Sequence, residues 1–127
     1  MLHYCLLFTS EENGGGGLGL NSQYKKGVLE LCVLALLSER DRYGYEVSEQ
    51  LSRSIEIADG TVYPILRKLK AEGLVTTYLQ EESGGPPRKY YKLTGLGAES
   101  YARDRAEYLE FAAAVQQILE AKRNDKG

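Results

Sequence analysis

The sequence lacks tryptophan and has only one histidine and two cysteines among its 127 residues. Two cysteines cannot build a disulfide framework, and with one histidine they cannot supply the four ligands of a standard cysteine–histidine zinc site. Long apolar runs are also missing, because the longest one, Leu31 to Leu37, is far shorter than the roughly 20 residues that cross a bilayer. These absences predict a soluble, cytoplasmic protein without a membrane span, a metal site or a cofactor.

Residue sets suited to catalysis are missing as well. The single histidine, His3, lies in an atypical first stretch, and no serine or cysteine has a base suggested by the sequence. The carboxylate pairs at 11–12 and 81–82 are expected in solvated loops. The GGGG and GLG segments lack the preceding strand and following helix of a phosphate-binding loop. We therefore predict that the chain is not an enzyme.

An overall excess of basic charge, typical of nucleic-acid binders, is also missing, because 16 Lys and Arg stand against 18 Asp and Glu. Between Thr61 and Lys92, however, six basic residues stand against three acidic ones. A local basic surface on a mildly acidic chain can still bind phosphate. The net charge of −2 therefore weakens a nucleic-acid role without removing it.

Residues 1–20 differ from the rest of the chain. A short apolar run, MLHYCLLF, precedes four consecutive glycines, which form a flexible tether because glycine loses much backbone entropy when ordered. A secretory signal is disfavoured, since no basic residue precedes the run and no small-residue cleavage site follows it directly. We expect a flexible or atypical leader outside the fold. The competing interpretation docks residues 6–8 as an extra strand or in a groove between subunits.

Apolar residues recur at helical spacing from Asn21 onward and predict three helices. The first begins at Asn21 or Ser22, ends at the polar turn SERDR, and is apolar nearly all round, so it should be buried on more than one face. The second begins at Tyr43. The third spans residues 61–72 and ends at Gly73, where a left-handed cap is expected.

From residue 74 the apolar period changes from 3.6 to 2. Residues 74–80 and 88–93 are typical of strands, and the segment EESGGPP between them predicts a β-hairpin. Thr94 is placed to cap a long final helix from about Gly95 to Lys122.

This order of elements predicts a mainly α, α+β fold. We expect a winged helix-turn-helix with a two-stranded wing and a C-terminal dimerisation helix. The expected division is residues 1–20 as the leader, residues 21–93 as the DNA-binding domain, and residues 94–127 as the dimerisation helix and tail.

The third predicted helix has a basic outer face. Its apolar residues recur at i, i+3, i+4 and i+7, whereas Arg67 and Lys68 point elsewhere. Such a helix fits the major groove of DNA with its N-terminal turn against the bases. Gly60 and Thr61 permit close approach, and Arg67 can pair with guanine or clamp a phosphate. The alternative is an ordinary solvated helix face.

The hairpin tip places two further basic residues where a wing contacts DNA. Arg88 and Lys89 follow the GGPP turn, and wings of this kind add salt-dependent contacts to the phosphate backbone. Glu81 and Glu82, on the other side of the tip, would repel phosphate. An ordinary exposed hairpin is the alternative.

Ten tyrosines are an unusual number for this length. A phenol can pack its ring in the core and give its hydroxyl to a phosphate, although core tyrosines with local partners are the plainer interpretation. Alternation along the second hairpin strand puts Tyr91 on one face and Tyr90 on the other, so at most one of them should point outward. The tyrosines near the helices and hairpin are Tyr43, Tyr45, Tyr63, Tyr90 and Tyr91.

The final helix carries an apolar stripe that the small body cannot cover, so the stripe needs a partner. A second copy of the chain is the economical one, and two-fold symmetry would place two recognition helices about one DNA turn apart. The alternative folds the stripe back on its own domain, chiefly on the first helix. The predicted interface residues are Tyr101, Tyr108, Phe111, Ala112, Val115, Ile118 and Leu119.

Three segments, KKGVLELCVLALLSERDRYGYEV, DGTVYPILRKLKAEGLV and GGPPRKYYKLTGLG, occur in this order. Together they resemble the PadR family of bacterial transcriptional regulators, from roughly residue 23 to the C-terminus, and the single final helix resembles the short subfamily. The resemblance implies a dimeric winged-helix repressor that is often relieved by a phenolic acid, a drug or another small ligand. Some multidrug-responsive members hold flat ligands between tryptophans, which this chain lacks.

By position, the resemblance adds Tyr63 and Pro64 to the recognition helix and supports the wing assignment of Arg88 and Lys89. We therefore predict a sequence-specific DNA-binding repressor relieved by a small phenolic or hydrophobic effector. The alternative is a winged-helix protein-interaction module that does not bind DNA. The predicted DNA-binding residues are Gly60, Thr61, Tyr63, Pro64, Arg67, Lys68, Arg88 and Lys89.

Overall fold

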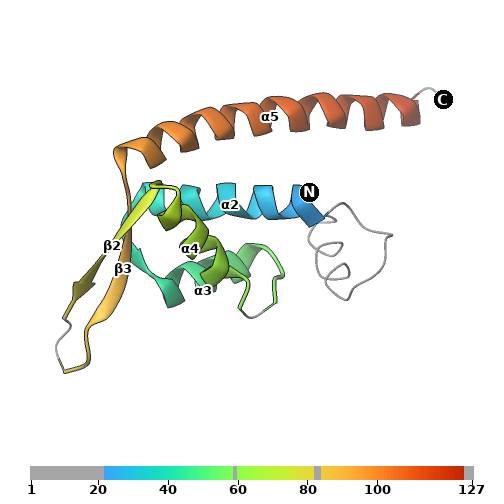
Figure 1. Ribbon diagram of the computed structural model, residues 1–127. Helices are drawn as coiled ribbons and strands as arrows, with labels where there is room; N and C mark the ends of the chain where they lie inside the picture. Colours follow the sequence, from blue (N-terminus) through green and yellow to red (C-terminus); the bar gives the residue numbers. More distant parts are fainter. Residues whose placement is uncertain (1–21, 59, 82–83, 125–127) are drawn as a thin grey trace.

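The computed structural model describes residues 22–58, 60–81 and 84–124, so the leader predicted for residues 1–20 lies outside it. The predicted order of helices and hairpin is confirmed (Figure 1). The helices are α2 (Ser22–Glu39), α3 (Gly44–Ser54), α4 (Val62–Ala71) and α5 (Gly95–Asn124), and the strands are β1 (Arg42–Tyr43), β2 (Val75–Gln80) and β3 (Arg88–Leu93).

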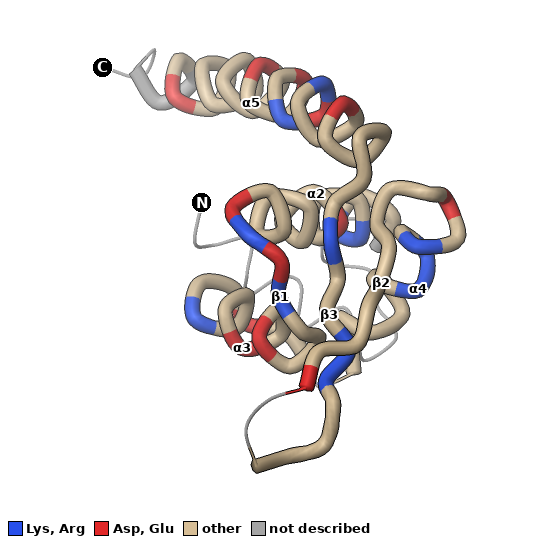
Figure 2. Tube along the Cα trace, turned by 90° about the vertical axis from the view of Figure 1, so that its left-hand side faces the viewer, with Lys and Arg blue, Asp and Glu red and all other residues tan. Residues whose placement is uncertain are grey.

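The sheet has one strand more than the sequence predicted. β2 and β3 form the expected antiparallel hairpin, and the two-residue β1 pairs with the other edge of β3, giving the order β1-β3-β2. Two residues are too few to show a period of 2, so no pattern could reveal β1. The hairpin tip lies at the end of the molecule opposite α5 (Figures 1 and 2).

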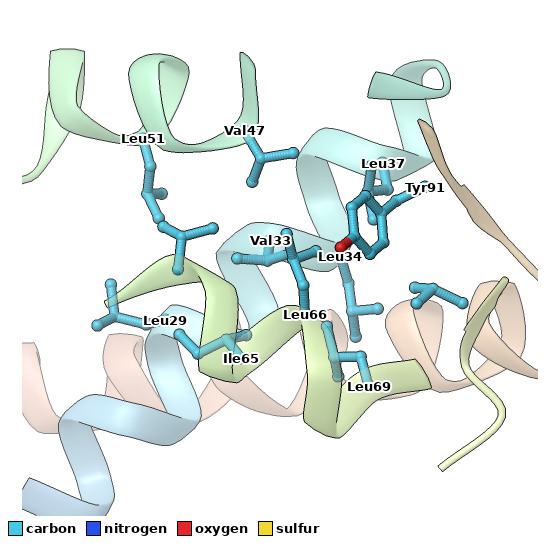
Figure 3. Packing of buried hydrophobic residues seen from close by; sticks show 12 residues of the cluster. Leu29, Val33, Leu34, Leu37, Val47, Leu51, Ile65, Leu66, Leu69 and Tyr91 are labelled. Atoms are coloured by element: carbon cyan, nitrogen blue, oxygen red, sulfur yellow. The ribbon is translucent and has the colours of Figure 1, made fainter. Parts of the chain in front are cut away.

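The core lies where α2, α3 and α4 meet the inner face of the sheet (Figure 3). The four stripe residues of α4 are at most 3% exposed, which confirms the predicted helical face. α2 contacts α3, α4, β3 and α5, as its all-round apolar character predicted. The buried core residues are Leu29, Val33, Leu34, Leu37, Val47, Leu51, Val62, Ile65, Leu66, Leu69, Val75 and Tyr91.

A buried arginine fixes the turn between α2 and β1. Arg42 Nε donates to the Leu36 carbonyl oxygen at 3.1 Å, and its Nη2 donates to the Glu39 carboxylate at 2.7 Å. The side chain of Arg42 therefore ties the last turn of α2 to the strand that follows it. At the start of α3, the backbone N–H of Tyr43 donates to the Glu46 carboxylate at 3.2 Å.

α4 ends in the left-handed cap that the sequence predicted. Gly73 has φ of +79°, and the Leu74 N–H donates back to the Leu69 carbonyl oxygen at 2.9 Å. This bond is typical of a helix that closes with glycine in the left-handed region. The chain therefore turns sharply from α4 into β2.

The start of α5 is anchored on this same turn. Thr94 Oγ1 accepts from the Gly97 N–H at 3.0 Å, as the predicted cap requires, and donates to the Gly73 carbonyl oxygen at 2.7 Å. Gly97 packs so tightly that an added Cβ would collide with the carbonyl oxygen of Leu74. The first turn of α5 thus touches the backbone that links α4 to β2.

Beyond its first turns, α5 runs antiparallel to α2 and continues past the N-terminal end of that helix (Figure 1). α5 has 30 residues and α2 has 18. Tyr101 packs against the core, whereas Phe111, Ile118 and Leu119 are exposed. Within the described ranges, no helix is long and apolar enough to cross a membrane.

Candidate nucleic-acid interface

The outer surface of α4 begins at the turn that precedes it. Gly60 has φ of +84°, in the left-handed region that favours glycine, and it is exposed. Thr61 stands at the N-cap and is half-buried, while Tyr63, Pro64 and Arg67 are exposed. We call these five residues the α4 face. Because the apolar stripe holds the opposite side of α4 in the core, the α4 face is accessible to a binding partner.

A glycine brings α3 against this face. The ring of Tyr63 lies over Gly44, the first residue of α3, and an added Cβ at Gly44 would come within 2.6 Å of Tyr63 Cε1. The glycine of the YGYE segment therefore permits the close approach of the two helices. The sequence showed the two tyrosine-containing segments but not that they meet.

Lys68, also predicted to bind DNA, is paired within the protein. Its Nζ lies 3.1 Å from the Glu30 carboxylate on α2 and 3.2 Å from the Glu72 carboxylate one turn further along α4. The hydrogen bond to Glu30 is the largest reason why the pKa of Lys68 is raised. Lys68 therefore links α4 to α2, a contact over 38 positions that helical spacing could not reveal.

The wing residues Arg88 and Lys89 are the first two residues of β3 and are both exposed. The guanidinium carbon of Arg88 lies over the Tyr43 ring, 4.5 Å from its centroid. Figure 2 shows basic residues on α4 and at both ends of β3. Glu81 is exposed on the other side of the tip, while Glu82 lies outside the described residues.

The predicted alternation of the two β3 tyrosines is confirmed. Tyr91 is buried in the core, and Tyr90 lies on the opposite face of the sheet. Burial is the main reason why the pKa of Tyr91 is raised; Tyr63 raises it further and Arg67 lowers it.

The predicted interface residues of α5 fall into two groups. Phe111, Ile118 and Leu119 are exposed by 57 to 66%. The other four are half-buried: Tyr101, Tyr108, Ala112 and Val115.

A groove of about 490 Å³ lies between α2 and α5, with the end of α4 as its third wall. Its described lining includes no lysine or arginine. Among the described residues, no three histidine, cysteine, aspartate or glutamate side chains gather to hold a metal ion. The aromatic and acidic lining residues are Tyr24, Tyr108, Phe111, Glu30, Glu72, Asp104 and Glu107.

Comparison with known proteins places this geometry in a family context. The sequence model of the "Transcriptional regulator PadR-like family" matches residues 33–103. An uncharacterized protein of Lysinibacillus sphaericus is 30% identical over 105 residues, which cover 80% of this chain and 96% of that protein. The transcriptional regulator Rv3488 of Mycobacterium tuberculosis is 28% identical over 94 residues, covering 73% and 87% of the two chains.

Solved structures show the same fold. The crystal structure of a PadR-like transcriptional regulator from Bacillus cereus is 35% identical, with a TM-score of 0.70, and the match covers 77% of this chain and 97% of that one. A PadR-like transcription factor from Bacteroides fragilis is 37% identical, with a TM-score of 0.65 and coverage of 76% and 95%. The predicted winged-helix fold is confirmed.

Proposed function

The chain belongs to the PadR-like family of transcriptional regulators, and on that premise we propose that it is a homodimeric repressor whose hold on operator DNA is relieved by a small molecule. DNA-binding transcriptional regulation is the activity of the family and of its solved members. The repression, the dimer, the effector and the individual contacts belong to the proposal.

The observation that carries the proposal is an accessible recognition surface beside a basic wing. The α4 face enters the major groove, where Arg67 has the reach and the donors to pair with guanine. Arg88 and Lys89 contact the phosphate backbone and add affinity without sequence preference. Lys68 joins this interface by exchanging Glu30 for a phosphate.

α5 supplies the second half of the proposal. Its exposed Phe111, Ile118 and Leu119 need a partner, and a second α5 brings the same residues to a two-fold interface. Residues 21–93 then form the DNA-binding unit and residues 94–127 the dimerisation arm. The remaining interface residues, half-buried in the single chain, complete the contact: Tyr101, Tyr108, Ala112 and Val115.

The groove between α2 and α5 supports a small hydrophobic effector. Tyr24, Tyr108 and Phe111 offer aromatic surface to a flat ligand. The carboxylates around them repel an anionic phenolic acid and favour a neutral phenol or an aromatic cation. An effector bound there touches α5 and the end of α4 together, so it can change how the two recognition helices are spaced.

The decisive experiment is a titration of DNA from upstream of the chain's own gene, followed by fluorescence anisotropy at several salt concentrations. We expect specific binding, and the logarithm of the binding constant should fall linearly with the logarithm of the salt concentration, since phosphates that bind the protein release counterions. A neutral phenol or an aromatic cation should release the DNA. Binding that ignores salt, or no preference over an unrelated duplex, would instead favour a protein-interaction module.

A further inference from the structure

Four tyrosine rings form a continuous row, three of them from the strands of the sheet and the fourth, Tyr45, from the start of α3. Tyr43 stacks on Tyr45 with ring centroids 6.4 Å apart and packs at a tilt against Tyr90 at 5.6 Å. Tyr90 in turn stacks on Tyr78 at 5.6 Å. We call this set the tyrosine row: Tyr45, Tyr43, Tyr90 and Tyr78.

Strand register explains how the row is built. Tyr43 of β1 and Tyr78 of β2 are both cross-strand partners of Tyr90 in β3, so three rings line up directly across the sheet. At one end, Tyr78 Oη donates to the Asp41 carboxylate at 2.7 Å. Aromatic cross-strand pairs stabilise sheets, and here they fix the position of Tyr43 at the edge.

Arg88 rests on that fixed ring. It lies two residues before Tyr90 in β3 and therefore on the same face of the sheet, and β1 is too short to pair with it. Its guanidinium reaches back over Tyr43, with 4.5 Å from Cζ to the ring centroid. A guanidinium over an aromatic ring keeps its charge and its N–H donors for a further partner.

We propose that Tyr43 is a positioning residue for DNA binding: its ring, held by Tyr90, keeps the Arg88 guanidinium oriented to meet a DNA phosphate. This inference rests on the proposed DNA-binding function and assigns to the YGYE segment a role at the wing as well as in α3. Preorganisation reduces the side-chain ordering that binding would otherwise require. An arginine on a bare hairpin would have to be ordered by the DNA itself.

The test is a set of variants titrated against a mixed-sequence DNA duplex, since phosphate contacts need no operator. Tyr43→Leu should weaken binding roughly two- to five-fold, the range of one exposed cation–π contact. Tyr43→Phe should bind like the wild type, because it keeps the ring. Arg88→Ala should reduce the slope of the logarithm of the binding constant against the logarithm of salt concentration by about 0.9, the value for one phosphate contact.

Double variants separate positioning from folding. In an Arg88→Ala background, Tyr43→Leu should have no further effect, whereas in an Arg67→Ala background it should keep its full effect. An equal loss in both backgrounds overturns the inference. If the wild type shows no salt-dependent DNA binding, the proposed function and this inference both fall. If Arg88→Ala loses DNA affinity but Tyr43→Leu does not, only this inference falls.

A second measurement uses only the wild-type chain and so does not depend on the folding of a variant. NMR relaxation of the arginine side-chain Nε groups should give Arg88 a higher order parameter than exposed Arg53 on α3. Equal order parameters would show that Tyr43 does not hold Arg88 and would overturn the inference without DNA.

Discussion

α2 and α5 run side by side, yet their apolar residues differ sharply in exposure. In α2, Leu29 and Val33 are buried in the core, and the helix contacts α3, α4 and β3 as well as α5. In α5, Phe111, Ile118 and Leu119 remain more than half exposed. The difference shows that the winged-helix body completes its own core, whereas α5 carries apolar surface that a single chain does not use.

The largest effect should come from truncating a side chain in the core of the winged-helix body. Leu66→Ala removes a fully buried side chain and should lower the free energy of unfolding by about 2–5 kcal/mol in urea denaturation, independently of protein concentration. Leu119→Ala is the matched control on α5. Its side chain stabilises the protein through the dimer, so the decrease in unfolding free energy that this variant causes should vanish on dilution. A loss at Leu119 that persists on dilution would mean that α5 packs on its own body.

Charging the α5 stripe should separate assembly from folding. The double variant Val115→Glu, Leu119→Glu should sediment as a folded monomer in analytical ultracentrifugation and lose operator binding, because one half-site binds weakly. The control, Ala113→Glu with Gln117→Glu, adds the same charge on the other side of α5 and should stay dimeric. If this double variant stays dimeric, the dimer interface lies elsewhere, and α2 is the next candidate.

A change on the α4 face should affect neither the core nor the dimer. Arg67→Ala should weaken operator binding by about 1–3 kcal/mol with little change in melting temperature, since the side chain is exposed. Lys68→Ala is the neighbouring comparison and should cost less DNA affinity, because that charge is already paired with Glu30 and Glu72. Unchanged operator affinity for Arg67→Ala would show that the α4 face is not the recognition surface.

The smallest effect should come from removing the leader. A chain that starts at Asn21 should keep its melting temperature, its dimerisation and its operator affinity, because the core residues of the described chain begin at Leu29. Ordering residues 14–17 would cost about 1–2 kcal/mol per residue, more than a small apolar patch offsets. A drop of several degrees on truncation, or protection of the 6–8 amides from hydrogen exchange, would assign the leader a structural role.

Local patterns predicted most of the fold. The apolar stripe of α4, the Gly73 cap and the Thr94 cap each depend on residues within one or two turns, and all three were found where expected. β1 escaped prediction because two residues carry no period. Its pairing with β3 depends on β3 exposing a free edge, which only the folded chain defines.

The site was less predictable because its contacts are non-local. Basic residues on α4 and the wing were visible as charge, but the pairing of Lys68 with Glu30 joins two helices. The approach of Tyr63 to Gly44 and the placement of Arg88 over Tyr43 likewise join segments far apart in the chain. Spacing shows which face of an element is polar, whereas the partner of that face depends on tertiary packing.

The anchor of α5 makes that helix a lever. Thr94 and the tight contact of Gly97 with Leu74 form a fulcrum at one end of an arm of 30 residues. Such an arm is about 45 Å long, so a rotation of about 5° at the fulcrum moves its far end by about 4 Å. In the proposed dimer, two arms joined along their length would convert a slight tilt at each fulcrum into a change in the separation of the two recognition helices, which must match one turn of DNA.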